Sequence, residues 1–106
     1  MESNAEARFD VGEVVVHTLF DYRGVVYDID PVFSLADEWY EAMARSKPPK
    51  DEPWYHVLVD GEVYTTYVAQ RNLKTNGTNL PVVHLLLSDY FSRFDGSSYL
   101  PRDRAN

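Results

Sequence analysis

The sequence predicts a mainly β fold, a small SH3-like antiparallel barrel with a short helical insertion and a C-terminal helix. Two observations lead to this fold class. Several short runs are rich in β-branched and aromatic residues and are separated by turn residues. The chain has 106 residues, of which 44% are hydrophobic, so it has enough apolar surface for one core. Its strands are too few for a sandwich and do not alternate with long helices, which argues against a parallel sheet.

The first two strands are expected in the segment "FDVGEVVVHTLFDYRGVVYDIDP". The runs "EVVVH" and "RGVVYDI" have strand composition, and "LFDYRG" with Gly24 provides the connection between them. Pro31 should end the second strand, because proline cannot donate a ladder hydrogen bond and restricts the residue before it.

A short helix is expected over residues 34–45, "SLADEWYEAMAR". Ser34 is a suitable N-cap, and Asp37 three positions later completes an approximate capping box. Leu35, Trp39 and Met43 are four residues apart and should share one face. The proline-rich loop "SKPPKDEP" follows the helix.

A hairpin is expected in "EPWYHVLVDGEVYTTYVAQRNL", because Asp60 and Gly61 suit a two-residue turn that would pair Val59 with Glu62. Aromatic and aliphatic side chains then lie on both faces, which favours core and interface over a surface for base stacking. Trp54, His56 and Tyr67 share one face. The residues expected at a subunit or partner interface are Trp39, Trp54, His56, Tyr67 and Phe91.

The C-terminal third is expected to contain a short helical turn at "AQRNL", a helix over about 82–95 and a last short strand at "SSYLP". Gly96 should end the helix by adopting a left-handed backbone conformation. We expect a disordered tail at 1–8 and a further tail at 101–106 around a single domain at 9–100, with the barrel itself at 9–73.

Catalytic and metal sites find little support in the sequence. There is no cysteine, and His17, His56 and His84 lack the close spacing typical of zinc ligands. Asp28 and Asp30 should share a strand face, where bonds to turn N–H groups explain them better than acid–base chemistry. With neither a nucleophile motif nor a glycine-rich phosphate loop, we expect no enzymatic activity, no metal and no cofactor.

The charge distribution bears on the choice of partner. The net charge is −7, and residues 28–62 carry nine acidic against three basic side chains, whereas residues 63–106 carry three against five. Such a chain should bind DNA weakly unless its basic residues gather on one face. It has neither a membrane-length apolar run nor a signal-peptide pattern, so we expect a cytoplasmic protein without membrane attachment.

The order of "VGEVVVH", "FDYRGVVYDIDPVF", "PWYHVLV" and "YVAQRNL" resembles the YccV-like family, which includes the heat-shock protein HspQ. The resemblance covers residues 9–73 well. It implies an SH3-like barrel, homo-oligomers, and two binding activities. One is binding of hemimethylated double-stranded DNA, and the other is action on the Lon protease as a substrate and a specificity-enhancing partner.

Two hypotheses about function follow, and they differ in the partner. The first is a protein-interaction module without DNA binding, which suits the negative charge. The second is a DNA binder with a local basic patch, for which the candidate contact residues are His17, Arg23, Arg71 and Lys74. A small hydrolase is a third and less favoured hypothesis, because it would need a cleft of convergent titratable groups with strongly shifted pKa values.

Overall fold

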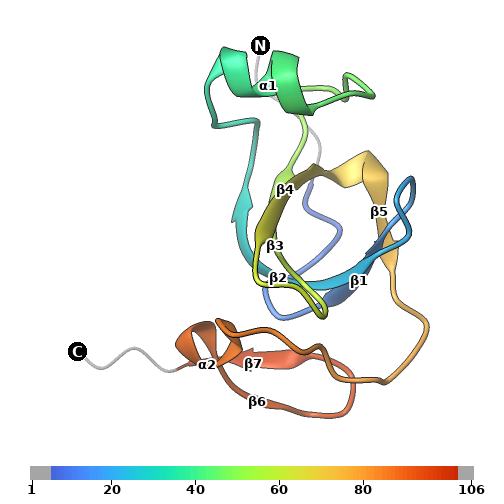
Figure 1. Ribbon diagram of the computed structural model, residues 1–106, viewed down its shortest axis with the longest axis vertical. Coiled ribbons are helices and arrows are strands. Elements are labelled where there is room, and N and C mark those ends of the chain that lie inside the picture. Colours follow the sequence, from blue (N-terminus) through green and yellow to red (C-terminus); the bar gives the residue numbers. More distant parts are fainter. Residues whose placement is uncertain (1–5, 103–106) are drawn as a thin grey trace.

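A five-stranded antiparallel sheet dominates the computed structural model, which describes residues 6–102 (Figure 1). The spatial order is β4-β3-β2-β1-β5, and the sheet curves strongly round its own core (Figure 1). The strands are β1 (Val14–His17), β2 (Arg23–Asp30), β3 (Trp54–Val59), β4 (Thr65–Ala69) and β5 (Leu73–Thr75). The predicted antiparallel, mainly β architecture is therefore confirmed.

The predicted barrel closure is not confirmed, because β4 and β5 form the two edges of the sheet and do not pair with each other. They are joined by the one-turn 3-10 helix η1 (Gln70–Asn72), as the sequence predicted for this stretch. A side-chain contact instead joins β4 to the connection between β1 and β2, since the Tyr22 hydroxyl lies 2.7 Å from Thr66 Oγ1. The sheet is thus a curved, open one.

Both faces of the sheet are buried, as the alternation in the hairpin predicted. The inner face forms one cluster, and the outer face forms two further clusters under different covers. The inner cluster contains Phe9, Val15, Val26, Tyr55, Val57, Val68 and Leu73. The outer clusters are Val14, Val25, Leu58, Val82, Phe91 and Tyr99 in one, and Tyr40, Ala44, Trp54 and Ala69 in the other.

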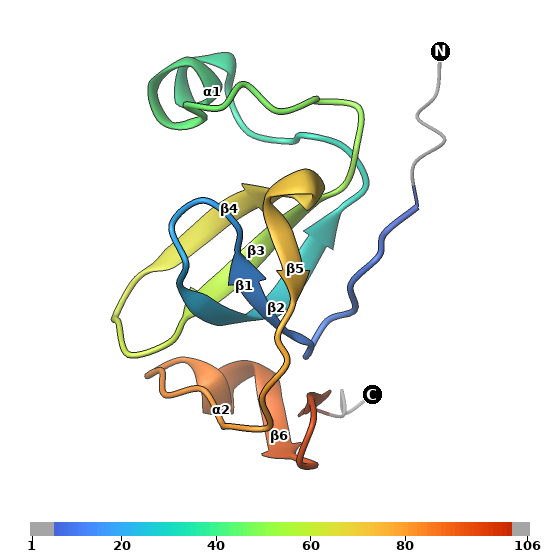
Figure 2. The same cartoon turned by 90° about the vertical axis from the view of Figure 1, so that its right-hand side faces the viewer.

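The helix predicted at 34–45 exists as α1 (Asp37–Met43) and covers one end of the sheet (Figure 2). Ser34 is not its N-cap, because the helix begins after Ala36 and the Ser34 hydroxyl donates instead to the Val32 carbonyl at 2.7 Å. The predicted stripe is also incomplete. Met43 is 61% exposed, and Tyr40 is the buried residue of the helix.

The long C-terminal helix predicted at about 82–95 is wrong. Only α2 (Leu87–Tyr90) is helical, and the next residues form β6 (Phe91–Phe94), which pairs with β7 (Tyr99–Pro101). Gly96, with φ +101°, therefore turns a hairpin rather than ending a helix. The two-stranded unit lies at the opposite end of the sheet from α1 (Figure 2). Among residues 6–102, no helix has the length and apolar character needed to cross a membrane.

The predicted two-residue turn at Asp60 and Gly61 is also wrong. Leu58 pairs with Thr65, so the loop spans residues 60–64 and the register is two residues away from the prediction. Both residues are engaged elsewhere, because Val83 donates to the Asp60 carboxylate and accepts from the Gly61 N–H. A shift of two residues preserves which side chains share a face, so the predicted faces remain correct.

The two predicted tails fall partly outside the described residues, at 1–5 and 103–106. The described part of the first is docked on the fold, since the Arg8 N–H donates to Gln70 Oε1 at 2.8 Å. In the second, Pro101 belongs to β7.

Candidate functional site

An aromatic cluster occupies the outer face of the sheet beneath α1. The Trp54 and Tyr67 rings stack with centroids 5.2 Å apart, and Trp39 from α1 meets both edge-on at 6.2 and 5.5 Å. Trp54 is only 1% exposed, and its indole N–H donates to the Pro49 carbonyl. These three residues, which the sequence assigned to an interface, therefore pack against one another within the chain.

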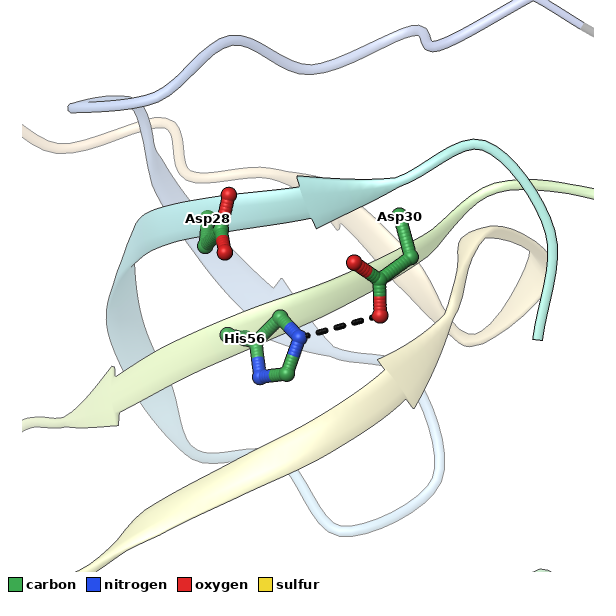
Figure 3. A group of neighbouring side chains, drawn as sticks. All are labelled: Asp28, Asp30 and His56. Atoms are coloured by element: carbon green, nitrogen blue, oxygen red, sulfur yellow. Dashed lines mark hydrogen bonds and ion pairs between the residues drawn. The ribbon is translucent and has the colours of Figure 1, made fainter. Parts of the chain in front are cut away.

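His56 lies beside this cluster and joins a polar group formed with Asp28 and Asp30 (Figure 3). A β-bulge in β2 lies between Val26 and Asp28, after which Asp28 is opposite His56 and Asp30 is opposite Trp54. The prediction that the two aspartates share a strand face is thus confirmed. The His56 Nε2 atom is 3.1 Å from Asp30 Oδ2, which also accepts the Tyr67 hydroxyl at 2.7 Å.

The three groups offer one ligand atom each within 4.8 Å, a spacing that a metal ion could also bridge. Zinc sites need three or four ligands that are free to point at one centre. Here one Asp30 oxygen already bonds His56 and Tyr67, and Asp28 Oδ1 accepts the N–H of Ile29 at 2.9 Å. These bonds explain the arrangement as a polar link between β2, β3 and β4. Burial and the neighbouring Asp30 carboxylate raise the pKa of Tyr67, which keeps its hydroxyl a donor.

A cavity of about 500 Å³ opens beside the aromatic cluster, between α1 and the connection from β1 to β2. All five residues of β4 line it, so it follows the free edge of the sheet. Two walls are apolar and partly exposed: Leu19 and Phe20 on one side, and Leu35 and Met43 on the other. Arg45 is the one Lys, Arg, Asp or Glu among the described lining residues, which also include His17 and His56.

Three arginines lie on η1 or on segments that contact η1, and one of them, Arg45, also lines this cavity. The Arg8 guanidinium donates to the Gln70 carbonyl at 3.4 Å, and the Arg71 guanidinium donates to the Ser46 carbonyl at 2.9 Å. Arg45 precedes Ser46 in the chain and lines the cavity. None of the three forms an ion pair with another residue in the described range, whereas Lys47 and Lys50 pair with Glu41 and Asp37. We call Arg8, Arg45 and Arg71 the arginine surface.

The four predicted DNA contacts are not gathered in one place. His17 is 6% exposed, and its Nδ1 accepts the N–H groups of Leu19 and Phe20. Arg23 forms an ion pair with Asp60 at 3.0 Å. Lys74 is exposed on β5, and Val16 of β1 lies between it and Arg23. Arg71 alone belongs to the arginine surface. Arg8 and Arg45 were not among the predicted contacts, because they belong to segments that are distant from Arg71 in the chain.

The fifth predicted interface residue is placed differently from the other four. Phe91 is 3% exposed in β6 and packs on Tyr99 with centroids 5.7 Å apart. It fills the core between the sheet and the C-terminal hairpin, whereas Trp39, Trp54, His56 and Tyr67 all line the cavity.

Comparison with known protein families gives a match that covers most of the chain. A family model with the description "Hemimethylated DNA-binding protein YccV like" matches residues 7–98. The matched range includes the curved sheet, α1, the arginine surface and β6.

Proposed function

The chain belongs to the YccV-like family, and from this premise we propose that it is a non-enzymatic protein that binds hemimethylated duplex DNA. The observation that carries the proposal is the family match over residues 7–98, together with the family's description. The proposed contact region is the arginine surface. Its three guanidinium groups are free of carboxylate partners among the described residues, so they can neutralise phosphates.

A local cluster matters here because the chain as a whole repels DNA. With a net charge of −7, affinity depends on whether a few cations act together at one place. Guanidinium groups that are tied to backbone carbonyls, as in Arg8 and Arg71, are also positioned before DNA arrives. Phosphate contacts fix the register of a protein on the duplex, and they do not themselves distinguish methylation states.

The test is a fluorescence anisotropy titration of hemimethylated, unmethylated and fully methylated duplexes of one sequence at physiological salt. We expect the hemimethylated duplex to bind most tightly. Replacing Arg71 or Arg45 by Gln should lower the slope of log Kd against log salt by about 1, because each variant neutralises one phosphate fewer. The matched control is Arg93→Gln on the exposed surface of β6, which should leave the slope unchanged. Equal, weak curves for all three duplexes would disprove the proposal.

A second candidate function is partnership with a protein, and the resemblance names the Lon protease. The apolar cavity and the negative net charge favour this partner class, since neither feature suits a nucleic acid. The experiment compares the rate at which Lon degrades a substrate with and without this protein. Equal degradation rates with and without the protein would rule out this partnership. Light scattering on the same sample would test the homo-oligomer that the resemblance implies.

A further inference from the structure

The free edge of β4 differs from an ordinary exposed strand, because all five residues of β4 line the cavity. The Gln70 N–H donates to the Pro53 carbonyl at 3.0 Å, and the same register continues through β4 and β3 without a bulge. In an antiparallel ladder, alternate residues turn both backbone groups toward the partner strand, and the others turn both away. Gln70 faces β3, so Thr65, Tyr67 and Ala69 direct their N–H and C=O groups away from it.

These outward groups are not paired within the described chain. Residues 6–102 supply no backbone or side-chain hydrogen bond to the main chain of Thr65, Tyr67 or Ala69. Unpaired edge groups commonly add a strand from another chain, and proteins usually block them with charges, prolines or a covering segment. In β4 the sequence TTYVA contains no charge and no proline.

The walls of the cavity define the side chains that such a strand would carry. Phe20 and Leu19 are 66% and 57% exposed on one wall, and Met43 is 61% exposed on the other. Side chains alternate between the two faces of a strand, so an added strand could place apolar groups against both walls. The five residues of β4 match a bound segment of about five residues, or roughly 17 Å of extended chain.

The charge of the cavity lining indicates which charged side chain the bound segment would carry. The chain has 17 acidic residues, yet none of those in the described range lines the cavity. Arg45 is the lining residue that carries a full positive charge. A basic segment would meet Arg45 without a compensating acid, whereas an acidic side chain would pair with it. Duplex DNA fits less well, because one lining arginine neutralises little of a phosphate backbone.

We propose that the β4 edge binds an extended, apolar peptide segment with an acidic residue, supplied by a partner protein, as an added sixth strand of the sheet. This inference goes beyond DNA binding and does not depend on it. The backbone of the peptide would pair with Thr65 and Tyr67, because Ala69 is only 2% exposed. Its apolar side chains would contact Phe20 and Met43, and its carboxylate would reach Arg45.

The test uses a capped seven-residue peptide of alternating valine and threonine with one aspartate. Its binding to the 15N-labelled protein is followed by NMR and by amide hydrogen exchange. We expect new protection at the N–H groups of Thr65 and Tyr67, whereas the Ala69 residue is already buried. Two control peptides should bind much more weakly: one with lysine in place of aspartate, and one with N-methyl groups on alternate residues that block the backbone bonds.

A variant at the edge separates strand addition from simple apolar contact. Thr65→Pro removes one outward N–H but no hydrogen bond to β3, and proline is tolerated in edge strands. It should weaken peptide binding roughly tenfold, the order expected when one hydrogen bond is removed. Thr65→Ala keeps the N–H and should bind like the native protein. If Thr65→Pro does not fold, Phe20→Ser provides the second test. Phe20 is exposed in the native protein, and loss of its ring should weaken peptide binding.

Four results would overturn the proposal. Thr65→Pro could bind as tightly as Thr65→Ala, the N-methylated peptide could bind as well as the parent, or the new protection could lie away from β4. Protection of the Thr65 and Tyr67 amides by a DNA duplex but not by the peptide would also overturn it, in favour of a nucleic acid at this edge.

Discussion

The guanidinium of Arg23 donates to the carboxylate of Asp60 at 3.0 Å, and these side chains are only 22% and 24% exposed. Arg23 also donates to the carbonyls of Leu80 and Pro81, while the second Asp60 oxygen accepts the Val83 N–H at 2.8 Å. The pair therefore attaches the segment before the C-terminal hairpin to the sheet. This role explains why a basic residue that the sequence assigned to DNA contact lies half-buried.

Arg23→Ala and Asp60→Ala should each lower the free energy of unfolding by about 1–3 kcal/mol, because each leaves buried polar groups unpaired. The double variant should lose less than the two single losses combined, since both remove the same interaction. Urea denaturation followed by tryptophan fluorescence measures the three values. Losses that simply add would show that the two side chains act independently.

Gly24 should not tolerate a side chain. A Cβ at this position would clash with Val57 Cγ1 and lie 2.6 Å from the Leu58 carbonyl oxygen, where β2 and β3 pair. Gly24→Ala should therefore lower the free energy of unfolding by about 3 kcal/mol, as expected for overpacking in a core. The control is Gly77→Ala, which meets no atom within 4 Å and should change stability by no more than about 1 kcal/mol. Similar denaturation midpoints for the two variants would contradict this packing.

The curved sheet could be predicted from the sequence because its signals are local. The runs in β1, β2 and β3 are rich in valine and aromatic residues, and Pro31 follows directly on β2. The faces of β3 and β4 also follow from period-2 alternation alone. The loop length did not follow, because Asp60 and Gly61 bond to Val83, a residue more than 20 positions away.

The C-terminal hairpin could not be predicted, because its stability comes from distant partners. Leu87, Phe91 and Phe94 fit a helical stripe, but Phe91 instead packs on Tyr99 and Tyr99 bonds the backbone of Gly12. The arginine surface and the β4 cavity also depend on tertiary contacts. Their residues come from the N-terminal segment, α1, the β1–β2 connection and η1, and no spacing along the chain relates them.

Tyr99→Phe should destabilise the C-terminal hairpin, because it removes the hydrogen bonds between the Tyr99 hydroxyl and the backbone of Val82. The Tyr99 hydroxyl accepts the Val82 N–H at 2.7 Å and donates to the Val82 carbonyl at 3.2 Å, and both residues are buried. Removing the hydroxyl leaves the amide without its partner, so the free energy of unfolding should fall by about 1–3 kcal/mol. Tyr90→Phe, at a residue 40% exposed, is the matched control and should change it by less than about 0.5 kcal/mol. An equal effect of the two changes would rule out the role of this bond.

Stability should fall on acidification because of His17. Its Nδ1 accepts the N–H groups of Leu19 and Phe20, both at 3.1 Å, and burial lowers the pKa of the ring from its ordinary value of 6.5. The unfolded chain then binds a proton more readily than the folded one. The contribution of neutral His17 is therefore fully present above about pH 6.5 and is lost as the pH falls from there through the lower folded pKa.

His17→Asn tests this linkage, because an asparagine oxygen can accept the same turn N–H groups but does not titrate. Between pH 7 and pH 5, the native protein should lose more stability in urea denaturation than His17→Asn loses. An NMR titration of the His17 ring should give a pKa below 6.5. Equal pH slopes for the two proteins, or a ring that titrates above 6.5, would mean that protonation of His17 does not oppose the folded β1–β2 connection.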